Sequence, residues 1–200
     1  MGISGFQGDL EEHIGAMERT FQQSSINGKV DIVMKAADLD NIDGLLIPGG
    51  ESTVISGLSS TNGTFQRMKA KINEGLPVMG TCAGLIMLSR RAYDKVVGES
   101  KQSLLGTLDV VVERNSYGRQ NNSFETDLSI PTLGAAPFRG VFIRAPSVKE
   151  MGPKVEVLAK LGESIVCVKQ GKIIGTSFHP ELTNDIRLHE FFLKSITEQN

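Results

Sequence analysis

Residues 76–89 have the sequence LPVMGTCAGLIMLS, which places Cys82 between an apolar segment and a run of helix formers. A strand that becomes a helix within two or three residues must turn sharply. Gly80 and Gly84 stand two residues before and after the cysteine, and without Cβ atoms they let strand and helix pass close together. The stretch therefore predicts a nucleophile elbow in which cysteine replaces the usual serine.

The elbow predicts a reactive thiol at Cys82. It directs the first free N–H groups of the following helix toward whatever the sulfur attacks, and the helix dipole favours thiolate over thiol. The alternative is a buried cysteine in an ordinary strand-to-helix turn, because free cysteine is among the most buried residue types. A catalytic cysteine needs a base and an oxyanion site from elsewhere in the chain.

Two other stretches offer these groups. A continuous apolar run at 44–47, typical of a strand covered on both faces, leads into Pro48-Gly49-Gly50-Glu51-Ser52-Thr53. This loop can form a cradle of backbone N–H groups; it can also be a simple turn with Ser52 as a helix N-cap, and the two are compatible.

The second stretch is His179-Pro180-Glu181, at the end of an expected strand over 172–178. In extended chain the side chains of His179 and Glu181 point to the same side, where a carboxylate can fix the imidazole tautomer and stabilise its protonated form. The alternative is a strand-end histidine with an unrelated acid nearby.

Composition limits the class of protein. With 200 residues we expect one domain over 1–200, and the net charge of −2 gives no basic field for nucleic acid. We expect no signal peptide and no membrane span, because no basic segment precedes a long apolar run. Two cysteines, Cys82 and Cys167, make no disulfide framework, which fits a reducing cytoplasm.

Helical and strand patterns alternate along the chain. We expect a helix over 10–23 capped by Asp9, with His13 as a surface or packing residue, and a closing helix over 184–196 with His189 on its polar or partly buried face. A further helix is expected over 64–73. Strands are expected within 1–6, 29–34, 44–47, 76–79, 104–113, 138–143, 155–158, 164–168 and 172–178, with a turn at 170–171.

This alternation predicts an α/β fold with a mostly parallel central sheet flanked by helices, and additional antiparallel strands. Ligands of such sheets bind at the carboxyl ends of the strands. Both the Gly49-Gly50 loop and Cys82 stand at such ends, whereas Cys167 falls inside an apolar strand and is expected in the core.

Cysteine, histidine and acid, in that chain order, supply a nucleophile, a base and an orienting group. We expect the Cys82 thiolate to attack a carboxamide carbon, and backbone N–H groups of Ala83 and the Gly49-Gly50 loop to hold the oxyanion. His179 would protonate the departing amine and then activate water to hydrolyse the thioester, while Glu181 holds His179 in place.

The three stretches around Gly49-Gly50, Cys82 and His179 resemble the signature stretches of class I (triad) glutamine amidotransferases, whose fold is flavodoxin-like. Within that family the chain resembles the glutaminase subunits of pyridoxal 5′-phosphate synthase. The specific marker is Arg114-Asn115-Ser116-Tyr117-Gly118-Arg119-Gln120, a polar loop that would otherwise be taken as solvated surface. The remaining supporting stretches are 7–9, 49–53, 142–146 and 177–182.

The resemblance implies hydrolysis of L-glutamine to glutamate and ammonia, without cofactor or metal. The ammonia would pass, inside a hetero-oligomeric complex, to a synthase subunit that uses ribose 5-phosphate and glyceraldehyde 3-phosphate. Glutamine would be contacted by Gly50, Glu51, Ser52, Arg114, Ile143 and Arg144. Gln7 would lie near the oxyanion loop and take part in communication with the synthase. The lone chain would be nearly inactive until docking flips a peptide of the Gly49-Gly50 loop.

Three alternatives differ in function. The chain could be the glutaminase subunit of another complex, such as imidazole glycerol phosphate synthase. It could be a catalytically silent regulatory subunit, although Cys82, His179 and Glu181 are all present. It could also be a cysteine hydrolase of unrelated substrate.

Overall fold

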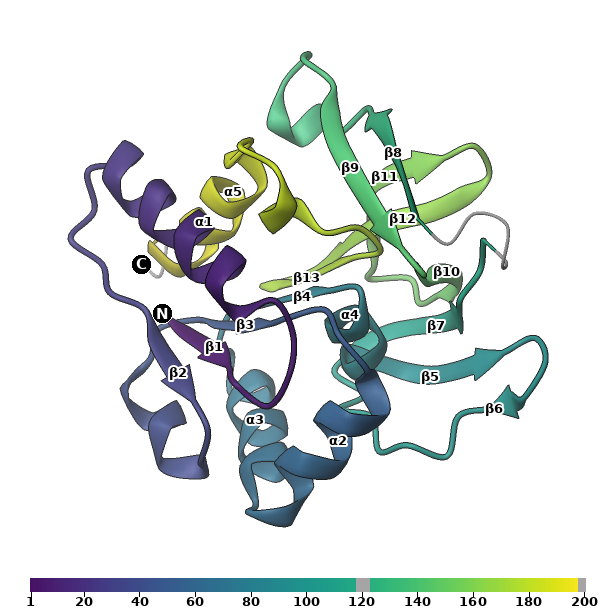
Figure 1. Ribbon diagram of the computed structural model, residues 1–200, viewed down its shortest axis with the longest axis horizontal. Helices are drawn as coiled ribbons and strands as arrows, with labels where there is room; N and C mark the ends of the chain where they lie inside the picture. Colours follow the sequence, from purple (N-terminus) through teal and green to yellow (C-terminus); the bar gives the residue numbers. More distant parts are fainter. Residues whose placement is uncertain (118–122, 198–200) are drawn as a thin grey trace.

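The computed structural model describes residues 1–117 and 123–197, and Figure 1 shows its central sheet with helices on both faces. The second half of the marker loop, Gly118 to Gln120, lies outside the described residues. Among the helices that are described, none is both long and apolar enough to cross a bilayer.

The first half of the chain and one late strand form the parallel part of the sheet. Its five strands follow the order β2-β1-β3-β4-β13, and every neighbouring pair is parallel. Their bounds are β1 Gly2–Ser4, β2 Asp31–Val33, β3 Leu45–Ile47, β4 Val78–Thr81 and β13 Ile173–Thr176. Because parallel neighbours end at the same edge, the segments that follow β1, β3, β4 and β13 meet there.

Helices cover both faces of this part (Figure 1). On one face lie α1 (Leu10–Gln23) and α5 (Arg187–Thr197), and on the other lie α2 (Ser52–Thr61), α3 (Thr64–Asn73) and α4 (Ala83–Leu88). Successive strand residues alternate between the faces: in β3, Leu46 packs in the α1/α5 core, whereas Leu45 and Ile47 pack in the other.

The sheet continues beyond β13 with mainly antiparallel pairs, in the order β12-β10-β7-β5-β6, and β11 pairs with β12. A separate antiparallel pair, β8–β9, lies beside it. The bounds are β5 Ser89–Asp94, β6 Gly98–Glu99, β7 Leu108–Arg114, β8 Ser123–Leu128, β9 Phe138–Ile143, β10 Ser147–Met151, β11 Glu156–Leu161 and β12 Ser164–Gln170. The predicted fold class, with its mostly parallel centre and additional antiparallel strands, is confirmed.

Element bounds follow local sequence signals closely in some places. The helices predicted over 10–23 and 64–73 and the strand over 138–143 are confirmed without change, and Gly171 turns the chain at a φ of 56° between β12 and β13. The closing helix begins at Arg187 instead of residue 184. Just before it the Asp185 carboxylate accepts the Arg187 N–H at 3.1 Å, which forms an Asx turn that precedes the helix.

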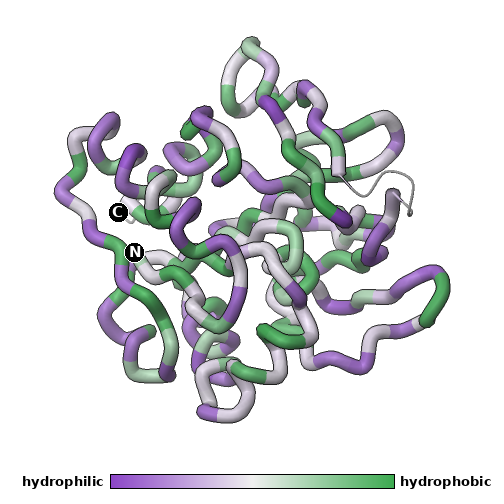
Figure 2. Tube along the Cα trace, in the orientation of Figure 1, coloured by the Kyte–Doolittle hydropathy of each residue, from purple (hydrophilic) through white to green (hydrophobic). Residues whose placement is uncertain are grey.

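Other elements differ from the expectation. The strand predicted from Leu104 begins only at Leu108, after Gly106 with a φ of 66°. β5 was not predicted, because its charged sequence SRRAYD follows a run of helix formers. The loop between β5 and β6 contains a hydrophobic segment (Figure 2), and the side chains of Val96 and Val97 in this loop are exposed.

Candidate active site

The turn at Cys82 has the geometry of an elbow. β4 ends at Thr81, α4 begins at Ala83, and Cys82 between them takes a φ of 48°, a region that non-glycine residues rarely adopt. The flanking glycines are required sterically: a Cβ on Gly84 would lie 2.1 Å from the carbonyl oxygen of Ile47, and one on Gly80 would lie 2.6 Å from the Gly84 carbonyl carbon. Strand and helix therefore pass as closely as the sequence predicted.

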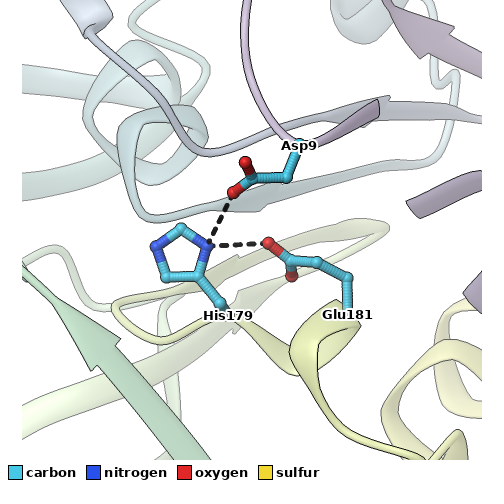
Figure 3. Close-up of side chains that lie close together, drawn as sticks. All are labelled: Asp9, His179 and Glu181. Atoms are coloured by element: carbon cyan, nitrogen blue, oxygen red, sulfur yellow. Dashed lines mark hydrogen bonds and ion pairs between the residues drawn. The ribbon is translucent and has the colours of Figure 1, made fainter. Parts of the chain in front are cut away.

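His179 and Glu181 lie together at the end of β13 (Figure 3). Nδ1 of His179 is 2.7 Å from Oε1 of Glu181, and both residues are buried. The prediction of an extended backbone between them is wrong, because Pro180 opens a short 3-10 turn, η4 (Pro180–Leu182). The long glutamate side chain still reaches the imidazole ring, so the hydrogen bond forms even though the backbone turns after His179.

Cys82 and His179 line one cavity of about 270 Å³. Its wall also contains all six residues predicted to contact glutamine, and adds Asp9, Ile86 and Asn115. The six are Gly50, Glu51, Ser52, Arg114, Ile143 and Arg144. Glu181 lies behind His179 and outside the wall.

The two remaining predicted residues, Gly49 and Ala83, are buried beside the cavity wall. Ala83 follows Cys82 as the first residue of α4. Gly49 lies against the imidazole, since a Cβ at this position would be 2.4 Å from Cε1 of His179. The loop after β3 and the loop after β13 thus touch at the edge where the parallel strands end.

The polar groups of the cavity are linked to one another. Arg114 donates to Oε1 of Glu51 at 2.8 Å, and the backbone N–H of Glu51 donates to the side-chain oxygen of Gln7 at 2.8 Å. Gln7 therefore lies near the Gly49-Gly50 loop, as the resemblance implied. Ser52 is the first residue of α2 rather than its N-cap, and its hydroxyl donates to Gln102.

The second side of the cavity comes from the end of β9. Sγ of Cys82 lies 3.7 Å from the carbonyl oxygen of Ile143. The next residue, Arg144, has a φ of 44°, an unusual backbone conformation for arginine. The end of β9 therefore lies against the sulfur.

Burial and charge act on the histidine–glutamate pair in opposite directions. Burial disfavours the imidazolium of His179, but hydrogen bonds to Cys82 and Glu181 and the charges of both outweigh it and raise its pKa to about 10. For Glu181, burial raises the pKa, and interactions with His13 and then with His179 bring it well below its usual range. The arrangement therefore favours a protonated imidazole beside the carboxylate of Glu181.

Asp9 makes a contact with this pair that the sequence did not predict. Asp9 forms no side-chain capping bond to α1, and its Oδ2 instead lies 3.8 Å from Nδ1 of His179. Asp9, His179 and Glu181 offer three ligand atoms within 4.8 Å of one another, but the short Nδ1–Oε1 hydrogen bond already uses two of these atoms. The geometry is that of an oriented base.

The other two histidines are fully buried, so the surface alternative for His13 and the expectation of a polar or partly buried face for His189 are both wrong. His13 contacts Glu181 and Thr81, whereas Cys167 lies in the core as predicted. One signal in the sequence points to the burial of His13: it stands four residues before Met17, on the apolar stripe of the helix.

Comparisons with known proteins identify the family of the chain. The model of the SNO glutamine amidotransferase family matches residues 3–198. The pyridoxal 5′-phosphate synthase subunit PdxT of Pyrococcus furiosus is 49% identical over 198 residues, covering 98% of each chain. PdxT of Nitrosopumilus maritimus is 44% identical over 198 residues, covering 99% of this chain and 97% of the relative.

Solved structures show the same relationship. A crystal structure of a glutamine amidotransferase superposes with a TM-score of 0.86 at 42% identity and covers 98% of each chain. A glutamine amidotransferase of Thermotoga maritima, at 14% identity and a TM-score of 0.62, shares the fold. The chain belongs to the SNO glutamine amidotransferase family.

Proposed function

We propose that this chain hydrolyses L-glutamine to L-glutamate and ammonia through a thioester on Cys82. One observation carries the proposal: Cys82 and His179 line the same cavity, whose wall also holds the Glu51–Arg114 ion pair. A nucleophile, a base and a pair of opposite charges suit an amino acid whose reacting group is a side-chain amide.

In the first half of the reaction the Cys82 thiolate attacks the carboxamide carbon. The resulting oxyanion accepts hydrogen bonds from backbone N–H groups of Ala83 and the Gly49-Gly50 loop. The imidazolium of His179 gives its proton to the amide nitrogen, the C–N bond breaks, and ammonia leaves. A protonated His179 is favoured by its hydrogen bonds to Cys82 and Glu181, which suits it to act as this acid.

In the second half a water molecule hydrolyses the thioester. Neutral His179 takes a proton from the water as its oxygen attacks the thioester carbon. Collapse of the second tetrahedral intermediate breaks the C–S bond, which releases glutamate and restores the thiolate and the imidazolium. Glu181 keeps Nδ1 of His179 engaged throughout, so that Nε2 serves both proton transfers.

The ends of the glutamine molecule match the charged wall. The guanidinium of Arg114 suits the α-carboxylate, and the carboxylate of Glu51 suits the α-ammonium group. In the present structure these two side chains satisfy each other, and substrate would take both over. Gly50, Ser52, Ile143 and Arg144 would complete the binding site around the amide.

The names of the relatives support one destination for the ammonia. They are subunits of pyridoxal 5′-phosphate synthase, and at 44–49% identity over nearly full length we infer the same assembly here. This chain would be the glutaminase subunit and would supply ammonia to a synthase subunit. We further propose that residues 1–200 act as one domain in a reducing compartment such as the cytoplasm, where the free Cys82 stays reduced.

The test is a glutaminase assay with and without the synthase subunit of the same organism. Wild type should release glutamate, and more of it with the synthase present, whereas Cys82→Ala should release none. Cys167→Ala is the matched control, because it removes the other cysteine without touching the cavity. Activity retained in Cys82→Ala, or absent from the wild-type complex, would refute the proposal.

Stimulation by a different synthase, such as that of imidazole glycerol phosphate synthesis, would place the chain in another complex. Failure of glutamine to protect Cys82 from a thiol-alkylating glutamine analogue would point to an unrelated hydrolase.

A further inference from the structure

His13 is a buried side chain of α1 that the reaction described above does not use. Its Nε2 lies 3.3 Å from Oε1 of Glu181 and 3.3 Å from Oγ1 of Thr81. One nitrogen atom thus contacts both the acid partner of His179 and the residue that precedes Cys82. Because α1 packs against η4, the helix holds this nitrogen close to the carboxylate.

Glu181 needs a second hydrogen-bond donor. Its side chain has no solvent exposure, and a carboxylate without water depends on protein donors to stay ionised. Oε1 accepts from Nδ1 of His179 at 2.7 Å, while Oε2 has no partner among the described residues. Nε2 of His13, 3.3 Å from Oε1, is the second nitrogen within ion-pair distance of this carboxylate.

The surroundings of the His13 ring fix which nitrogen carries the proton. Nδ1 is buried without a partner in the described part of the chain, and the ring of His189 lies edge-on with centroids 6.4 Å apart. A buried N–H without an acceptor is costly, whereas a proton on Nε2 meets the oxygen of Glu181. A proton on Nε2 is therefore the one that satisfies the contact with Glu181.

We propose that His13 is a positioning residue that holds the Glu181 carboxylate in line with His179, extending the chain of contacts to Cys82–His179–Glu181–His13. It does not line the cavity, and its contact with Glu181 connects it to His179. The inference rests on the proposed glutaminase function. It adds that a residue of the first helix belongs to the catalytic arrangement.

Removing the donor should weaken the hold on His179. With one hydrogen bond fewer, the ionised form of Glu181 is less favoured, and its support for the imidazolium declines. The loss of activity on the alkaline side, where His179 gives up its proton, should therefore begin at a lower pH than in wild type. The binding of glutamine should change little, because His13 is not part of the cavity wall.

Other ionisable groups lie around His179 and Glu181, and none of them is substituted in a variant that changes only His13. They come from the loop before α1, the elbow, α1 itself, the loop before α5, and α5. In that order they are Asp9, Cys82, Arg19, Asp185 and His189. A shift of the alkaline limb of kcat in a His13 variant is therefore attributable to the lost contact between His13 and Glu181.

The experiment compares His13→Asn with His13→Gln in the complex with the synthase subunit. The amide nitrogen of glutamine can take the place of Nε2, whereas that of asparagine takes the place of Nδ1 and faces away from Glu181. We expect His13→Asn to lower kcat by about 10- to 100-fold, the loss of one hydrogen bond to a charged group, with KM changed less than about twofold. Its alkaline limb of kcat should move to lower pH, and His13→Gln should recover most of both.

His189→Leu is the matched control. This histidine is equally buried, neither of its nitrogens has a partner among the described residues, and burial lowers its pKa to about 3. It is thus a neutral packing residue that makes no hydrogen bond to Glu181. We expect His189→Leu to lose thermal stability but to keep the kcat and alkaline limb of wild type.

The possible outcomes distinguish failure of the proposed glutaminase function from failure of the positioning role of His13. A wild-type complex without glutaminase activity would remove the proposed function itself. An active wild type with His13→Asn unchanged in kcat and pH limb would overturn the positioning role alone. Equal losses in His13→Asn, His13→Gln and His189→Leu would also overturn it, since they would show that His13 only fills space.

Discussion

Arg114 donates a hydrogen bond to Oε1 of Glu51 at 2.8 Å across 63 residues of sequence. The two charges come from the end of β7 and the loop after β3, and both line the cavity that contains Cys82. A ligand with one carboxylate and one ammonium group can exchange this internal pair for two pairs of its own. We therefore expect the Glu51–Arg114 pair to select for a free amino acid.

Arg114→Gln should impair glutamine binding more than chemistry. Loss of a charge-assisted hydrogen bond to the α-carboxylate costs about 1.5–3 kcal/mol, so KM should rise by about 10- to 100-fold while kcat falls less. Steady-state glutaminase kinetics of the complex measure both. Arg139→Gln, which removes a half-exposed arginine paired with Asp127 on β8–β9, is the control and should leave KM unchanged. An equal loss of kcat and kcat/KM would contradict a binding role.

Gly84→Ala should destabilise the fold. The added methyl group would lie 2.1 Å from the carbonyl oxygen of Ile47, so β3 and α4 must move apart, at a cost of about 1–3 kcal/mol. Gly57→Ala is the matched change: it lies inside α2 with nothing near its Cβ position, and should stabilise by about 0.5–1 kcal/mol. Urea unfolding measures both. Equal stability of the two variants would mean that the close approach at the elbow is not real.

The two cysteines should differ in their reaction with iodoacetamide. Cys167 is fully buried in β12, and burial raises the pKa of its thiol to about 12. Cys82 lines the cavity and contacts His179, so we expect alkylation at Cys82 first, slowed by added glutamine. Mass spectrometry of proteolytic fragments assigns the labelled site. Labelling of Cys167 at a comparable rate in folded protein would contradict this arrangement.

His179 should make stability depend on alkaline pH. Its pKa is raised from 6.5 to about 10, so the folded chain binds this proton more tightly than the unfolded chain does. The stabilising contribution is complete below about pH 6.5 and is lost as pH rises through about 10. We therefore expect the free energy of unfolding to decline over this window in wild type, and to decline less in His179→Gln.

His189→Gln provides the control for that measurement. The pKa of His189 is lowered to about 3, so this group is neutral in both states above about pH 6.5 and contributes no slope there. Parallel curves for wild type and His179→Gln would show that the imidazolium of His179 is not stabilised by its neighbours.

Much of the fold was predictable because its signals are local. The apolar spacing of Leu10, Ile14, Met17 and Phe21 predicted α1 to the residue, and the paired glycines around Cys82 predicted the elbow. β5 was missed because its sequence lacks the apolar alternation of a strand. It is held in the sheet by pairing with β7, a partner that is distant in sequence.

The sequence by itself determined the elbow at Cys82, the neighbouring His179 and Glu181, and the position of each at a strand end. Each of these depends on backbone geometry within a few residues, which residue type and spacing encode directly. Only the tertiary structure decided that Asp9 faces His179 instead of capping its helix, and that His13 meets Glu181. Such contacts depend on which strands become neighbours and how α1 packs on the sheet, and no spacing along the chain specifies where two buried polar groups from distant segments will meet.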